Sequence, residues 1–233
     1  MSAPTPATEA PWTAGLHSAR ALFRPALILQ GAALALVLGY YFLPAARGAF
    51  VQLAIWRTEG GFIFSAFASA VCGGLLPLLY LQFSASGPMA NPWREGLFLI
   101  GFWAWKGAEV DLMYRTLNRF VGSDAGFATI SFKVLIDQFC FNPLYASPVG
   151  CLIFAWKNAG YRWRPVVADV KAGRWYFRRV LPVLIGVWAL WLPVVSCVYA
   201  LPDPLQIPLF NVVLCFWSLL FTAVLQRQQM GKP

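Results

Sequence analysis

The sequence predicts an all-α fold: a polytopic membrane helix bundle with about six transmembrane or partly embedded helices. Of its 233 residues, 59% are hydrophobic and only 12% are charged, about half the charged fraction usual in soluble proteins. Long apolar segments recur along the chain, and basic residues gather between them. Because lipid offers no partners to backbone N–H and C=O groups, segments that cross it are expected to be helices.

Each apolar segment is close to the ~20 residues that a helix needs to cross a ~30 Å hydrocarbon core. Prolines within the segments predict kinks, and Pro143 and Pro148 are placed to divide the fourth segment in two. The predicted segments are 26–46, 61–83, 96–113, 127–156, 180–201 and 207–226. The expected organisation is a disordered polar N-terminus (1–24), a single transmembrane helix-bundle domain (25–228) and a C-terminal tail (229–233).

The distribution of Lys and Arg predicts the orientation in the membrane. With six spans, the termini and the loops 84–95 and 157–179 share one side, which holds twelve Lys and Arg against four on the other. Loops rich in Lys and Arg stay on the cytoplasmic side. We expect a bacterial cytoplasmic membrane, with a mitochondrial or other organelle membrane as the alternative. Four spans plus two partial helices is the chief alternative topology.

The net charge of +9 is therefore interpreted as a topology signal rather than as a nucleic-acid surface. Besides the lipid bilayer itself, the expected partners are anionic lipid headgroups at the basic 157–179 loop. No cofactor and no metal site are predicted, because the five cysteines lie in apolar segments without CxxC spacing and His17 is the only histidine.

Small residues recur every four positions in the second segment, which is a helix-packing pattern. Ser65, Ser69 and Gly73 form one stripe, and Gly74 belongs to a second stripe beside it. Such stripes let helix backbones approach closely. Two interpretations are open: packing inside one bundle, or a face that binds a second copy in a homo-oligomer.

Ionisable residues at membrane depth are costly, so they are expected to face the bundle interior. Residues three or four apart share a helix face, so Lys106 with Glu109, Asp111 with Arg115, and Lys133 with Asp137 can pair. Asp137 is expected to be buried, with Lys133 or Lys106 as its partner. The candidate polar network comprises Lys106, Glu109, Asp111, Arg115, Lys133, Asp137 and Gln138.

Two functions fit these buried charges. They either fasten helices in a non-transporting scaffold or assembly protein, or they line a channel-like path for ions or small metabolites. An enzyme is not predicted, because the sequence shows no HExxH motif, no paired aspartate motif and no Gly-x-Ser-x-Gly motif.

Three stretches resemble the family named for the mitochondrial Mpv-seventeen protein and the 22-kilodalton peroxisomal membrane protein. "KVLIDQFCFNPLY" carries the lysine, the Asp-Gln pair and the later proline of that family. "GFWAWKGAEVDLMYRTL" matches at four positions but has Ala108, Asp111 and Met113 where the family has Pro, His and Trp. "WALWLPVVSCVYALPDP" is a more divergent third match. The matching residues in the last two stretches and beyond are Gly101, Gly107, Tyr114, Leu117, Trp188, Trp191, Pro193, Pro204 and Trp217.

The resemblance covers roughly residues 60 to 226, and it identifies the chain as a divergent relative. The family is similar to channel-like proteins of organelle membranes, and it is linked to passage of small solutes and to redox and mitochondrial DNA homeostasis. The resemblance thus implies a channel-like membrane protein.

Overall fold

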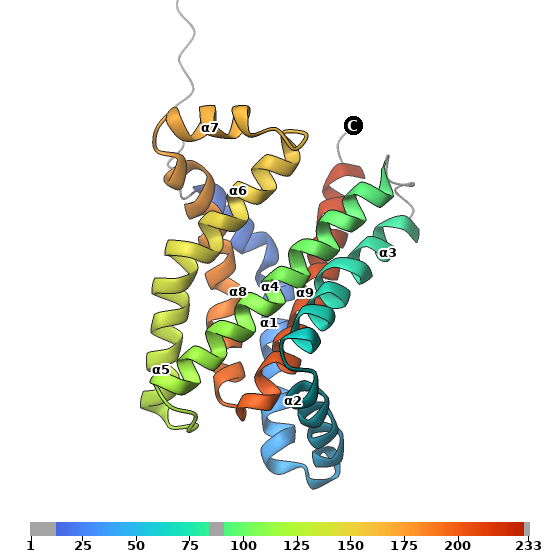
Figure 1. Cartoon of the computed structure of the whole chain (residues 1–233), viewed down its shortest axis with the longest axis vertical. Coiled ribbons are helices and arrows are strands. Elements are labelled where there is room, and N and C mark those ends of the chain that lie inside the picture. The colour runs from blue at the N-terminus through green and yellow to red at the C-terminus, as the bar shows by residue number, and fades with distance from the viewer. Residues whose placement is uncertain (1–12, 84–90, 231–233) are drawn as a thin grey trace, which may run out of the picture. The chain divides into compact units, whose positions relative to one another are not determined.

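The computed structural model describes residues 13–83 and 91–230, with side chains described mainly within 26–83 and 91–219 (Figure 1). All regular structure in these residues is helical. The α-helices are α1 (Thr13–Phe42), α2 (Arg47–Ser69), α3 (Leu76–Phe83), α4 (Pro92–Phe120), α5 (Phe127–Ile136), α6 (Ser147–Asn158), α7 (Trp163–Lys171), α8 (Leu181–Tyr199) and α9 (Asp203–Met230). Short π-helical segments are η2 (Ala70–Leu75), η3 (Asp137–Ala146) and η4 (Tyr176–Val180).

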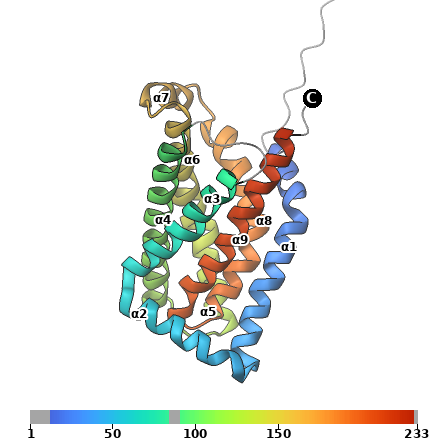
Figure 2. The ribbon, with the colours of Figure 1, turned by 90° about the vertical axis from the view of Figure 1, so that its right-hand side faces the viewer.

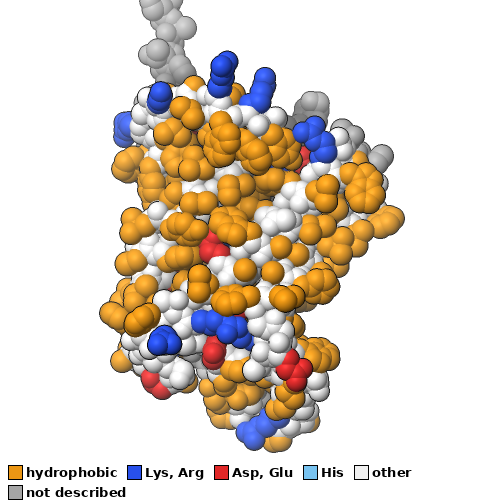
Figure 3. All heavy atoms as spheres, viewed as in Figure 1, with side chains coloured by type: hydrophobic (Ala, Val, Ile, Leu, Met, Phe, Trp, Pro, Cys, Tyr) orange, Lys and Arg blue, Asp and Glu red, His pale blue; other side chains and the backbone are white. Residues whose placement is uncertain are grey.

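Three helical stretches are long and apolar enough to cross a membrane: Pro44–Phe83, Phe127–Asn158 and Tyr176–Tyr199. Shorter apolar helices cover Ala26–Phe42 and Asp203–Leu219. Figure 3 shows one face of the protein, on which hydrophobic side chains greatly outnumber charged ones. The predicted all-α membrane fold is confirmed, and all six predicted segments lie mainly within helices. The protein is an integral membrane protein.

The chain divides into two compact units, whereas the sequence suggested one bundle over 25–228. Unit 1 comprises residues 1–24 and 135–192, and unit 2 comprises residues 25–134 and 193–233.

The two predicted tails differ in part from the structure. The N-terminal stretch expected to be disordered is helical from Thr13 onward, because residues 14–24 are rich in Ala, Leu and Arg, which favour helix. Residues 1–12 lie outside the described part of the chain. At the other end α9 continues to Met230, and the rest of the predicted tail is not described.

In unit 2, a bend at Gly61 redirects helix α2. A straight helix over Pro44–Phe83 would be about 60 Å long, twice the hydrocarbon thickness. Gly61 has φ 52° and ψ −133°, a conformation open to glycine but strained for other residues. Figure 2 shows the first part of α2 crossing below the lower end of α9, and the later part rising into α3.

Beyond this bend, the small-residue stripe packs against α4 inside unit 2. Ser65 and Ser69 are fully buried. A Cβ atom at Gly74 would lie 2.9 Å from the Cα of Ile100, and one at Gly73 would overlap the Trp103 ring. The stripe therefore serves packing within the chain, the first of the two interpretations.

In unit 1, the π-helical segment η3 leads directly into α6. Pro143 lies inside η3 and Pro148 in the first turn of α6, so the predicted division at these prolines is wrong. The wider turn of a π-helix accommodates a residue that cannot donate a backbone hydrogen bond. The Tyr176 hydroxyl donates to the Pro143 carbonyl at 3.0 Å, so η4 is tied to η3.

The six-span topology predicts that the 157–179 loop and the α4–α5 loop lie on opposite sides of the membrane. Lys171 and Ser123 are exposed residues of these loops. In a variant whose native cysteines are replaced by alanine, Lys171→Cys and Ser123→Cys should react with an impermeant maleimide from opposite faces of sealed vesicles. Labelling of both from one face would contradict the six-span order.

The Gly74 contact predicts a strong effect from one methyl group. Gly74→Ala should destabilise the protein by about 1–3 kcal/mol, because the facing atoms belong to the α4 backbone and cannot rotate away. Leu at both Gly73 and Gly74 should be worse. Thermal unfolding in detergent measures the loss. Gly31→Ala is the control, since no atom lies within 4 Å of its Cβ position; equal tolerance of both substitutions would contradict the close contact.

Candidate functional site

The carboxylate of Asp111 is the centre of a buried ionic cluster in unit 2. Helix α4 directs it toward α2, and it is fully buried. It accepts hydrogen bonds from the Arg57 guanidinium, from Ser65 Oγ at 2.7 Å and from Arg115 Nε at 3.0 Å. A carboxylate removed from water needs such compensation, because unpaired buried charge is strongly destabilising.

Two members of this cluster reach the surface, and one of them, Asp203, is the first residue of α9. The side chain of Asp203 is 41% exposed and lies 3.9 Å from Arg57, which is itself buried. The side chain of Arg115 is 36% exposed and lies over the Phe62 ring. Two cations thus balance two carboxylates. We call Arg57, Ser65, Asp111, Arg115 and Asp203 the charge network.

A second set of polar contacts joins α5, α4 and α9. Lys133 is buried and donates to Asn118 Oδ1 at 2.5 Å. Asn118 Nδ2 donates to Gln206 Oε1 at 3.2 Å, and Gln206 donates to the Leu201 carbonyl at 3.1 Å. The Lys133 ammonium also lies 5.5 Å from the centre of the Tyr199 ring. The half-buried Asn118 amide therefore accepts from this lysine, which forms no ion pair with any described residue.

A third polar contact lies further along α9. Ser69 Oγ donates to Asn211 Oδ1 at 2.7 Å, and both residues are buried. The Asn211 amide donates in turn to the Ile207 carbonyl. Polar residues on α9 thus extend from Asp203 through Gln206 to Asn211, a rise of about 12 Å along the helix.

The charges of α4, which the sequence analysis grouped in one candidate polar network, form two separate pairs. Lys106 and Glu109 pair with each other, as predicted, and are largely buried. Asp111 binds Arg115, also as predicted, but in addition binds Arg57. Glu109 and Asp111 are two residues apart, so they point to nearly opposite sides of the helix. The two pairs therefore occupy separate environments.

In unit 1, a row of buried polar side chains follows η3. Gln138 Nε2 donates to Asp137 Oδ1 at 3.1 Å, Asn142 donates to Gln138, and Ser147 Oγ donates to Asn142 at 2.6 Å. The i, i+5 repeat of a π-helix brings Asn142 and Ser147 to the same side. Trp188 Nε1 donates to the Gln138 carbonyl at 2.8 Å.

The predicted burial of Asp137 is confirmed, but its predicted lysine partners bond elsewhere. Asp137 is 5% exposed and accepts from Gln138. Lys133 donates to Asn118, and Lys106 donates to Glu109. The expected pairing ignored these acceptors, because asparagine was not considered as a partner for a buried ammonium group.

The residues that carry the family resemblance have mixed environments. Tyr114 is buried in edge-to-face contact with Tyr199, its ring centre 5.1 Å away. Gly107 touches Ser65 and Ser69 so closely that a Cβ would overlap both. Leu117 is buried, whereas Gly101 is exposed. The remainder are Trp191 and Trp217, both half-buried, Pro193 within α8 and exposed, and Pro204 in the first turn of α9.

Several site residues were absent from the sequence-based candidates. Arg57 was counted only as a topology charge. The missed uncharged residues share one signal, since each is an amide or hydroxyl side chain in or beside an otherwise apolar segment: Asn118, Asn142, Ser147, Gln206 and Asn211.

Comparison with known proteins adds no relative: no protein-family model matches the chain, and no curated protein and no solved structure matches it. Within the described residues, no group of His, Cys, Asp and Glu is arranged to hold a metal ion. The fold and the buried polar groups define an α-helical integral membrane protein with internal ion pairs.

The charge network predicts strong coupling between Asp111 and Arg57. Asp111→Ala should cost about 3–5 kcal/mol, because it leaves the buried Arg57 without its closest anion. Adding Arg57→Met to Asp111→Ala should cost less than the sum of the two single losses. Denaturant unfolding in detergent measures all three. Exposed Glu59→Gln is the control and should change stability by less than about 0.5 kcal/mol; additive losses would contradict the coupling.

Proposed function

We propose that this protein is a channel-like membrane protein that passes ions or small metabolites. Part of its path is the polar face between α2, α4 and α9, by which we mean the charge network together with Ser69 and Asn211. The path would begin at Asp203 beside the α8–α9 turn and continue to Asn211. Their separation of about 12 Å along α9 is somewhat less than half of a ~30 Å hydrocarbon core.

The observation that carries this proposal is a pair of incompletely satisfied atoms in the charge network. Arg57 Nε and Asp203 Oδ1 are buried and form no hydrogen bond with any described residue. A buried polar atom without a partner costs about 1–3 kcal/mol. Water or a small polar solute that entered from the turn would meet a free donor and a free acceptor.

The described conformation fits a closed state of this path. The Ser69–Asn211 hydrogen bond lies at the inner end of the polar face. Beyond it, Gly73 and Gly74 bring η2 directly against the backbone and aromatic side chains of α4. Opening would require η2 and α4 to separate. The glycine at the bend of α2 is the position best able to absorb such a change.

We further propose that the chain is a divergent relative of the Mpv-seventeen and 22-kilodalton peroxisomal protein family, in a bacterial cytoplasmic membrane. The family's buried tyrosine and close glycine are represented by Tyr114 and Gly107. Asp111 stands where the family has histidine, and here it binds two arginines. An acidic side chain in place of an imidazole supports a solute preference different from that of the family.

A scaffold without transport is the second candidate, and one observation favours it. Asp111 accepts hydrogen bonds from three different side chains, so this carboxylate is saturated and suited to fastening helices. Asp203 is therefore the better residue for separating the two functions, because its carboxylate is partly exposed and incompletely bonded.

Single-channel recording of the purified protein in a planar bilayer tests the proposal. We expect conductance above that of the empty bilayer, with a reversal potential that shifts toward lower cation preference in Asp203→Asn. Glu59→Gln removes one negative charge from an exposed α2 position and should leave the reversal potential unchanged. A folded protein without conductance would favour the scaffold. Conductance whose reversal potential is unchanged in Asp203→Asn would place the path elsewhere.

A further inference from the structure

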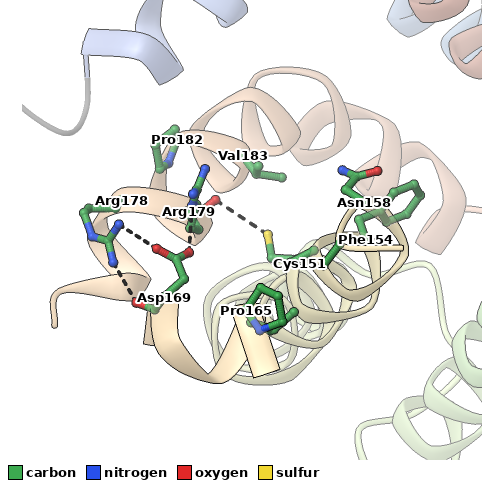
Figure 4. Close-up of a pocket in the computed structure, with 12 residues that line it drawn as sticks. Cys151, Phe154, Asn158, Pro165, Asp169, Arg178, Arg179, Pro182 and Val183 are labelled. Carbon is green, nitrogen blue, oxygen red and sulfur yellow. Dashed lines mark hydrogen bonds and ion pairs between the residues drawn. The ribbon is translucent and has the colours of Figure 1, made fainter. Parts of the chain in front are cut away.

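Unit 1 contains a cavity of about 600 Å³ between α6, α7 and the start of α8 (Figure 4). Its volume lies within the roughly 300–1,000 Å³ typical of small-molecule sites. Apolar side chains line much of it, including Phe154, Val166, Pro182 and Val183. Arg178, Arg179 and Asp169 also line the cavity. The site thus combines a hydrocarbon-like wall with cationic groups.

The two arginines differ in how many of their nitrogens are bonded within the protein. Arg178 is held by three bonds: Nε to the Gly173 carbonyl, Nη1 to Asp169 Oδ1 and Nη2 to the Asp169 carbonyl. Arg179 bonds to Asp169 through Nε alone among the described residues, at 3.0 Å, and its side chain is 59% exposed. Its two terminal nitrogens therefore remain available as a preoriented fork. Such a fork matches the geometry of phosphate oxygens.

Asp169 positions the fork rather than closing the site. Hydrogen bonds from Arg178 and Arg179 lower the pKa of the Asp169 carboxyl, so it stays ionised near neutral pH. One carboxylate against two guanidinium groups leaves the site with a net positive charge. An anionic ligand would be attracted to this surplus charge.

The position of α7 along the chain and its amphipathic surface indicate a membrane surface. One apolar stretch ends at Asn158 and the next begins at Tyr176, so the segment between them leaves and re-enters the bilayer. On α7, Trp163, Val167 and Val170 are all exposed, and their spacing places them on one side of the helix. Such helices lie in the headgroup region with the apolar side toward the acyl chains.

We propose that this cavity binds one anionic phospholipid, with its phosphate on the terminal nitrogens of Arg179 and one acyl chain against Phe154 and Val183. The charge, the apolar wall and the membrane-surface position each match one part of such a lipid. A zwitterionic lipid would bring a cationic headgroup against the same arginines and bind less tightly. The site is independent of the polar face in unit 2, so it stands whether or not the protein conducts.

Native mass spectrometry of the delipidated full-length protein in detergent tests this site. Phosphatidylglycerol should bind about tenfold more tightly than phosphatidylcholine with the same acyl chains. Arg179→Gln should lower the phosphatidylglycerol affinity about tenfold and leave the phosphatidylcholine affinity nearly unchanged. Arg164→Gln removes the same charge from an exposed α7 residue outside the cavity and should have less than a twofold effect.

A second variant tests the apolar half of the site. Val183→Trp adds bulk to the cavity wall without changing charge, and it should lower the affinity for both lipids. Melting curves of the lipid-free variants check that each remains folded.

Three results would overturn the proposal. Equal losses from Arg179→Gln and Arg164→Gln would indicate diffuse surface charge instead of a site. Glycerol phosphate that competes as well as the whole lipid at equal concentration would indicate an anion site without an acyl-chain component. Unchanged lipid affinity in Val183→Trp would place the chain outside the cavity.

Discussion

The fold of unit 2 depends on the Asp111 carboxylate, which binds the parts of the bent helix α2 before and after its bend. Arg57 lies before the bend at Gly61 and Ser65 lies after it, and both side chains bond to Asp111 of α4. The carboxylate therefore fixes the bend angle of α2 at Gly61, which the glycine alone would leave free to vary. Once that angle is set, the small residues that follow are directed onto α4, where close backbone contact replaces the hydrophobic driving force that lipid does not provide.

Fastening and permeation make different demands on a buried charge. A fastener is most stable when every donor and acceptor is matched, as both oxygens of the Asp111 carboxylate are. A path needs groups whose bonding is incomplete, so that a solute can exchange with water and leave again. Arg57 meets both demands, because its terminal nitrogen binds Asp111 while its Nε bonds to no described residue. Structural and transport roles can therefore coexist in one cluster.

Whether the sequence predicted an interaction depended on how far apart the interacting residues lie along the chain. Six helical segments and the Lys106–Glu109 and Asp111–Arg115 pairs followed from local rules, namely hydrophobicity over ~20 residues and the three-to-four-residue repeat of a helix. The Arg57–Asp111 bond joins residues 54 positions apart, so no local rule could find it. The π-helical form of η3 was also hidden, because α and π turns share the same apolar composition.

The ion pairs that the sequence did not predict also change how the number of Lys and Arg residues on each side of the membrane is interpreted. In the six-span order, Arg57 and Arg115 supply half of the four basic residues on the non-cytoplasmic side. Both bind Asp111 in the folded protein, so little of their charge remains for lipid headgroups. On the side that the six-span order predicts to be cytoplasmic, Arg178 likewise bonds to Asp169 and to the loop backbone, whereas the terminal nitrogens of Arg179 bond to no described residue. Arginine side chains thus bind lipid headgroups only where their hydrogen-bond donors outnumber the acceptors that the protein itself supplies.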